Sequence, residues 1–217
     1  MPLAIGVAIS PVPIIAIVLM LGTPRARSNG PAFTLGWLVG LTVVGTVMLV
    51  IASGNAAEES GEPATWSSVL LLVLGVLLLL LAARTWRSRP AAGQEGRMPK
   101  WMQAIDAFTA GKALGGGVLM SALNPKNLLL TIAAATAIAQ TGISGGEQAI
   151  AMAVFVILGS VTILAPLVIY LAMGAKATGI LDGLKAWMVA HNAAIMTVLL
   201  LVMGAKLIGN AIAGLSS

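Results

Sequence analysis

The sequence predicts an all-α integral membrane protein with six transmembrane helices. Apolar residues make up 59% of the 217 residues, charged residues make up only 9%, and the mean hydropathy is +1.01. A soluble domain carries about a quarter charged residues, so most of this surface cannot face water. Apolar runs of about 20 residues, the length that crosses a bilayer, recur along the chain. They cover approximately Leu3–Gly22, Ala32–Ser53, Trp66–Trp86, Ala113–Ala139, Gln148–Gly174 and Trp187–Ile212.

The first apolar run has no basic residue before it, which is typical of a true span rather than a cleavable signal peptide. The loops that follow alternate in charge: the first, third and fifth are basic, and the second and fourth are acidic. In chain order the charged residues are Arg25 and Arg27, then Glu58, Glu59 and Glu62, then Arg84, Arg87, Arg89, Arg97, Lys100 and Lys112, then Glu147, then Lys176 and Lys185. Because Lys and Arg in short loops stay in the cytoplasm, we expect a cytoplasmic-membrane protein with both termini outside.

The basic third loop, residues 87–110, divides the chain into two halves of three helices, residues 1–86 and 111–217. Three is odd, so the second half enters the membrane from the opposite side, as in the inverted-topology repeats of many secondary transporters. Within the loop, Trp101, Met102, Ile105 and Phe108 fall at helical spacing. They predict a short interfacial helix on the cytoplasmic leaflet, with a plain connector as the alternative.

Prolines interrupt the first and fourth apolar runs at corresponding places, in Ser10-Pro11-Val12-Pro13 and Asn124-Pro125-Lys126. Proline inside a helix removes a hydrogen bond from the carbonyl one turn earlier, and in lipid that carbonyl must find another partner or line a wet cavity. The carbonyls concerned are those of Val7, Ile9 and Ser121. A pair of broken helices in the two halves of a membrane chain indicates a transporter's binding site, whereas a single break can be a kink used only for packing.

Lys126 lies near the middle of its predicted span, where a cation costs about 2.5–3.5 kcal/mol on insertion scales. It should therefore face the protein interior, although the predicted spans contain no Asp or Glu to pair with it. The alternatives are carbonyls of the loosened helices, Asn127, Ser10, or an anionic group of a substrate, which we favour; a neutral lysine that exchanges a proton competes with these. The predicted substrate-binding residues are Lys126, Asn124, Asn127, Ser10 and Ser121, with Pro11, Pro13 and Pro125 as helix-breaking, gating residues.

Other functional classes find little support. The chain has no cysteine, no phosphate-binding glycine loop, no metal-ligand cluster and no nucleophile–base set, so we expect neither an enzyme nor a cofactor or metal site. The net charge of +5 belongs to loops and helix ends, which argues against nucleic acid. The single histidine, His191, reads as structural, and Lys206 should snorkel outward. Small-residue spacings at Gly36–Gly40 and Gly111–Gly115 permit close helix approach and leave a homodimer open.

On Ile9–Pro13, Ser121–Lys126 and the Arg-rich middle loop, the chain resembles the lysine exporter (LysE) superfamily. Within it, the chain is most similar to the GAP group, the peptidoglycolipid addressing proteins. The resemblance implies export of a small solute, or a part in moving glycolipids to the cell envelope. The superfamily often has glycine between the two prolines, where this chain has the less permissive Val12.

We therefore expect an exporter that works by alternating access on an anionic or zwitterionic headgroup or solute in the lipid bilayer. One alternative is an amino-acid or ion exporter of a sister family. Another is a non-transporting scaffold that recruits partners for envelope lipid assembly through its basic middle loop.

Overall fold

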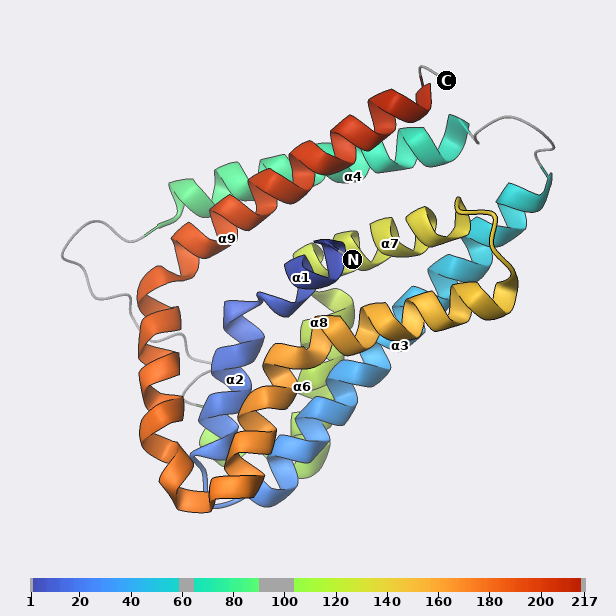
Figure 1. Cartoon of the computed structure of the whole chain (residues 1–217). Helices are drawn as coiled ribbons and strands as arrows, with labels where there is room; N and C mark the ends of the chain where they lie inside the picture. Colours follow the sequence, from blue (N-terminus) through green and yellow to red (C-terminus); the bar gives the residue numbers. More distant parts are fainter. Residues whose placement is uncertain (1, 59–64, 90–103, 216–217) are drawn as a thin grey trace.

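The computed structural model describes residues 2–58, 65–89 and 104–215, and every secondary-structure element in this part of the chain is a helix (Figure 1). In chain order the elements are α1 (Pro2–Ala8), α2 (Pro11–Leu21), α3 (Ala26–Glu58), α4 (Thr65–Arg87), η1 (Ile105–Ala107), α6 (Ala110–Val118), η2 (Leu119–Leu123), α7 (Pro125–Ala139), α8 (Gly145–Met173), η3 (Gly174–Ala177) and α9 (Thr178–Leu215).

The described helices supply between four and six candidate membrane spans. Helices α3, α4, α8 and α9 are each long and apolar enough to cross a bilayer on their own. Two further spans arise if bent pairs count as one each: α1 with α2, bent by 45°, and Ala110–Leu123 with α7, bent by 60°. All six predicted apolar runs coincide with these elements, and both predicted breaks are present.

Helix ends follow local chemistry. Helix α8 begins with a capping box, because the Ser144 hydroxyl accepts the Glu147 amide and the Glu147 carboxylate accepts the Ser144 amide. It ends at Gly174, whose φ of +58° suits glycine. Helix α9 begins at Thr178, well before the predicted run at Trp187. Its first turns contain Asp182 and Lys185, which form a 2.8 Å salt bridge. Hydropathy alone missed those turns because they are polar.

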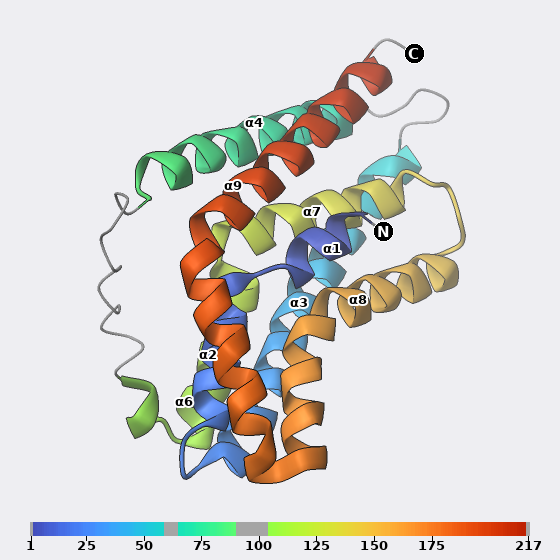
Figure 2. The same ribbon diagram turned by 60° about the vertical axis from the view of Figure 1, so that its left-hand side comes forward.

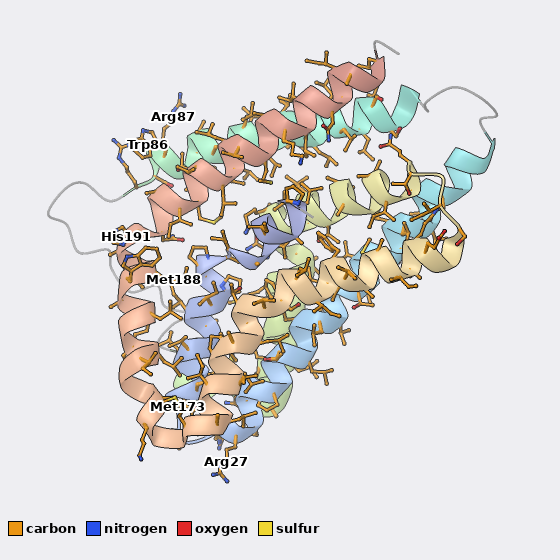
Figure 3. The ribbon with its side chains drawn as sticks, in the orientation of Figure 1. Arg27, Trp86, Arg87, Met173, Met188 and His191 are labelled. Carbon is orange, nitrogen blue, oxygen red and sulfur yellow. The ribbon has the colours of Figure 1, made fainter. Side chains whose placement is uncertain are left out.

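The outward faces of the long helices are apolar. Val50, Leu80, Ile150 and Val198 are each more than half exposed, on α3, α4, α8 and α9 respectively. Figure 3 shows apolar side chains projecting from these helices, while Arg27 and Arg87 point away from the bundle near helix ends. A surface of this kind fits a hydrocarbon environment better than water.

Small residues bring α3 and α6 into backbone contact. A Cβ on Gly36 would lie 2.0 Å from the Leu114 carbonyl oxygen, and one on Gly117 would lie 2.1 Å from the Phe33 carbonyl oxygen. The predicted role of the Gly36–Gly40 spacing is thus confirmed. The prediction that the Gly111–Gly115 spacing allows close helix approach is wrong, because nothing described lies within 4 Å of a Cβ at either position.

Helix α4 packs against α9, and these two helices form a layer beyond α1 and α7 (Figures 1 and 2). At their crossing a Cβ on Gly75 would lie 2.9 Å from the Gly204 carbonyl oxygen, and the reverse distance is 3.0 Å. Helices α1 and α7 pack together, with α8 against α1 and α3 against α7. The two broken helices are therefore central.

Residues 90–103 of the middle linker, among them the predicted interfacial positions Trp101 and Met102, lie outside the described residues. Ile105 lies in the short turn η1 and is 1% exposed, packed in the protein core rather than presented to a leaflet. The Phe108 carbonyl accepts the Asn29 amide at 3.0 Å. These contacts hold the end of the linker against α2 and α3.

Candidate functional site

The site starts from the carbonyl groups at the end of α1, which stop making helical bonds. Pro11 and Pro13 have no N–H for the carbonyls of Val7 and Ile9, as the sequence predicts. The amide of Ser10 turns back to the Ala8 carbonyl at 2.8 Å instead of serving Gly6 one turn earlier. The helix end thus carries several carbonyls that need other partners.

Lys126 is the hydrogen-bond donor for two of those carbonyls. Its Nζ donates to the Gly6 carbonyl at 2.6 Å, to the Ile9 carbonyl at 2.9 Å and to the Ser10 hydroxyl at 2.7 Å. An ammonium group has three N–H donors, so this geometry uses all of them. A neutral amine has two N–H donors for the two carbonyls and one lone pair that can accept the Ser10 hydroxyl, so both forms of the lysine can make these three contacts.

Ser10 joins Lys126 to the rest of the helix end. Its hydroxyl lies 2.6 Å from the Val7 carbonyl and 3.0 Å from Asn127 Oδ1, so its single proton serves one of these acceptors at a time. The last carbonyl, that of Ala8, also accepts the Thr162 hydroxyl from α8. Every freed carbonyl at the end of α1 therefore has a donor.

Helix α7 places Lys126 by a break of its own. The Asn124 side chain caps the helix by accepting the Lys126 amide at 3.1 Å, and Pro125 occupies the first helical position. Across the break, Asn127 Nδ2 donates to the Met120 carbonyl at 3.0 Å, within the π-helical turn η2. The side-chain amide thus holds the two halves of the bent pair together.

The electrostatics of the site come from helix ends and neutral oxygens. Lys126 lies in the first turn of α7, where the partial positive charge of the helix disfavours a cation, and its side chain crosses to the partially negative end of α1. The three acceptors are uncharged oxygens. Lys126, Ser10 and Asn127 are 3%, 1% and 0% exposed, so the cluster is closed to solvent in this structure. We call these three residues, with the carbonyls of Gly6, Val7 and Ile9, the lysine cluster.

The structure brings most of the predicted site residues together. Lys126, Ser10 and Asn127 are in direct contact, and Asn124 contributes through its cap. Ser121 lies apart: its hydroxyl donates to carbonyls of its own helix, those of Gly117 and Val118, and touches α3. Sequence reasoning missed Thr162, although a hydroxyl in the middle of an apolar run was a visible signal.

His191 and Lys206 lie away from the lysine cluster, on α9. The His191 ring stacks on Trp187 with 4.9 Å between centroids, and its Nδ1 lies 2.8 Å from the Trp187 carbonyl oxygen, on the exposed side of α9 (Figure 3). Lys206 is also exposed on α9. A groove at the end of α4, lined by Leu80, Ala83, Arg84, Arg87 and Ser88, contains no residue of the lysine cluster.

The fold and the cluster define a multi-pass α-helical membrane protein in which two bent helix pairs meet at a buried lysine. The family described as Sap, sulfolipid-1-addressing protein, matches residues 1–213, so the chain belongs to that family. The match fits the resemblance to the peptidoglycolipid addressing group. Neither curated proteins nor solved structures gave a match.

Proposed function

We propose that this protein is a carrier that moves an anionic lipid headgroup, of the sulfated glycolipid kind, across the cytoplasmic membrane by alternating access. The observation that carries the proposal is the fully buried Lys126, which joins the broken ends of α1 and α7. Discontinuous helices that meet inside a bundle are where secondary transporters bind their substrates.

The proposal includes six spans arranged as two inverted halves, as in the lysine exporter superfamily. The helix contacts support it, because each contact between the two halves has a counterpart when the halves are interchanged. Helix α8 packs on the bent pair α1–α2, and α3 packs on the bent pair formed by α6, η2 and α7. Helix α4 of the first half packs on α9 of the second.

The proposal also places the basic loops in the cytoplasm and both termini outside. Arg27, Arg87 and Lys176 lie near connections that the alternation of charge assigns to the cytoplasm. In Figures 1 and 2 the C-terminus lies toward the same end as the α7–α8 connection, and η3 lies toward the opposite end.

The proposed substrate class rests on the positive charge of Lys126, which has no acidic partner in the cluster, together with the family's name, which points to a sulfolipid. A sulfate ester is an anion with several acceptor oxygens, and charge-assisted hydrogen bonds to it are stronger than those to neutral carbonyls. Such a headgroup would therefore compete with the carbonyls of Gly6 and Ile9 for the ammonium of Lys126. Release of those carbonyls would free α1, which couples binding to opening.

Transbilayer movement of a matched lipid pair tests this function. We would reconstitute the protein in phosphatidylcholine vesicles with a fluorescent sulfated galactolipid or its unsulfated parent, and follow quenching from outside. The wild type should move the sulfated lipid faster than its unsulfated parent. Lys126→Gln should abolish this movement, while Lys206→Gln, an exposed control on α9, should keep it. Undiminished movement with Lys126→Gln would overturn the role of Lys126.

A second candidate is a membrane scaffold for lipid assembly. It is favoured by the completeness of the lysine cluster, in which every ammonium proton already has a protein acceptor, as in a purely structural lysine. Deletion of about residues 89–98 separates the two, because a scaffold that recruits partners through its basic linker should fail, whereas a carrier should keep most of its lipid movement.

A further inference from the structure

The end of α1 has the features of a cation site. Two backbone carbonyls and one hydroxyl converge on one point, with Gly6, Ile9 and Ser10 oxygens 2.6–2.9 Å from the same nitrogen. In transporters with discontinuous helices, unwound carbonyls and the C-terminal ends of half-helices hold the coupling cation. Here the position that such an ion would take is filled by the ammonium of Lys126.

We propose that the end of α1 is a monovalent-cation site that the chain fills with its own side chain, so that this protein operates without a bound alkali-metal ion. The acceptors carry no full charge, which suits one positive charge and would not offset the charge of a divalent ion. The site binds an alkylammonium ion when the Lys126 side chain is removed. The inference about energy coupling rests on the proposed carrier function, whereas the site itself does not.

Three observations argue that the acceptors belong to α1 rather than being gathered by the lysine. The Ile9 carbonyl is freed by Pro13, whatever residue occupies position 126. The Gly6 carbonyl is freed because the Ser10 amide bonds Ala8. The Ser10 hydroxyl is held by the Val7 carbonyl at 2.6 Å, which directs a lone pair toward the site. The convergence of the three acceptors is therefore set by the local backbone at the end of α1, also where α1 moves away from α7.

Chemical rescue tests the site directly. Lys126→Ala removes three methylene groups and the ammonium, which together equal n-propylammonium. We would measure the thermal unfolding midpoint of purified protein in detergent, titrating n-propylammonium chloride against choline chloride at equal ionic strength. Choline carries the same charge but offers no N–H donor, so it controls for salt.

A ligand that binds only the folded form raises the midpoint in a saturable way. We expect propylammonium to restore about half or more of the loss in Lys126→Ala and to leave the wild type and Lys112→Ala, an exposed control, unchanged. Equal effects of propylammonium and choline on Lys126→Ala would overturn the site. If the variant is recovered from membranes only when propylammonium is present, that recovery supports the site, and a failure of recovery with propylammonium contradicts it.

The wild type gives an independent readout. Its unfolding midpoint should not change when sodium or potassium replaces choline at constant ionic strength, and a specific rise with either ion would contradict a site already filled from within. These measurements involve no lipid movement. A failed rescue therefore leaves the carrier function standing, and absent lipid movement leaves the cation site standing.

Discussion

Substitution of Ser10 by alanine removes the hydroxyl that links Lys126 to the Val7 carbonyl, while leaving the Lys126 side chain in place. The Ser10 hydroxyl accepts a hydrogen bond from the Lys126 ammonium at 2.7 Å and donates one to the Val7 carbonyl at 2.6 Å, so Ser10→Ala removes both contacts. It leaves one N–H of the Lys126 ammonium and the Val7 carbonyl without this partner, at a position where the serine itself is only 1% exposed.

The magnitude follows from the two bonds. A hydrogen bond to a charged group contributes about 1.5–3 kcal/mol and a neutral one about 0.5–1.5 kcal/mol, which gives about 2–4.5 kcal/mol for Ser10→Ala. Side-chain hydrogen bonds inside membrane proteins average nearer 0.6 kcal/mol, so about 1 kcal/mol is the floor. At about 2–4 °C per kcal/mol for a chain of this size, the unfolding midpoint should fall by about 4–18 °C, and by at least about 2 °C at the floor.

Thermal unfolding in detergent, followed by tryptophan fluorescence, measures the change. The matched control is Thr197→Ala, which removes a buried hydroxyl that bonds only within its own helix, at 2.7 Å to the Ala193 carbonyl. Its midpoint should fall by about 1–6 °C, and by less than that of Ser10→Ala, since only one neutral bond is lost. Equal losses for the two variants would refute the reasoning that Ser10 holds the cluster together.

Two further predictions concern the elements that position the cluster. Gly117→Val should prevent α3 and α6 from packing, because its Cβ would meet the Phe33 carbonyl oxygen at 2.1 Å; the yield of monodisperse protein checks this, and Gly115→Ala, which meets nothing within 4 Å, should keep the wild-type yield. Asn124→Ala should cost about 1 kcal/mol by removing the cap of α7, while Asn124→Ser should keep most of the stability. Unfolding midpoints that rank these two variants in the opposite order would contradict the capping role.

The sequence predicts the main helices and the two breaks because hydropathy and proline act locally. Runs of apolar residues fix the helices without reference to neighbours. Proline spacing fixes which carbonyls are freed, and two of the carbonyls predicted to be free, those of Val7 and Ile9, are the ones that Ser10 and Lys126 serve. Loosened-helix carbonyls and Ser10 are two of the alternatives for the partner of Lys126, beside Asn127 and the favoured anionic group of a substrate, and the structure places Lys126 on both of them.

What could not be predicted depends on how helices meet. The Gly6 carbonyl joins the cluster because the chain turns at Ile9 and Ser10, a backbone detail that no residue type announces. Thr162 reaches the Ala8 carbonyl only because α8 packs on α1. Ser121 lies one turn before the break and was assigned to the site by sequence distance, yet the π-helical turn η2 directs it toward α3.

Movement of α1 is the step on which the proposed alternating access depends, and a reversible cross-link tests it. A Cβ on Gly159 of α8 would lie 3.5 Å from Val7 Cβ, within disulfide range, and the chain has no cysteine of its own. We would measure movement of the sulfated lipid by Val7→Cys/Gly159→Cys before and after oxidation, with each single variant as control. We expect the disulfide to stop lipid movement and a reductant to restore it. A disulfide that forms completely and leaves the rate unchanged would contradict a carrier in which α1 moves.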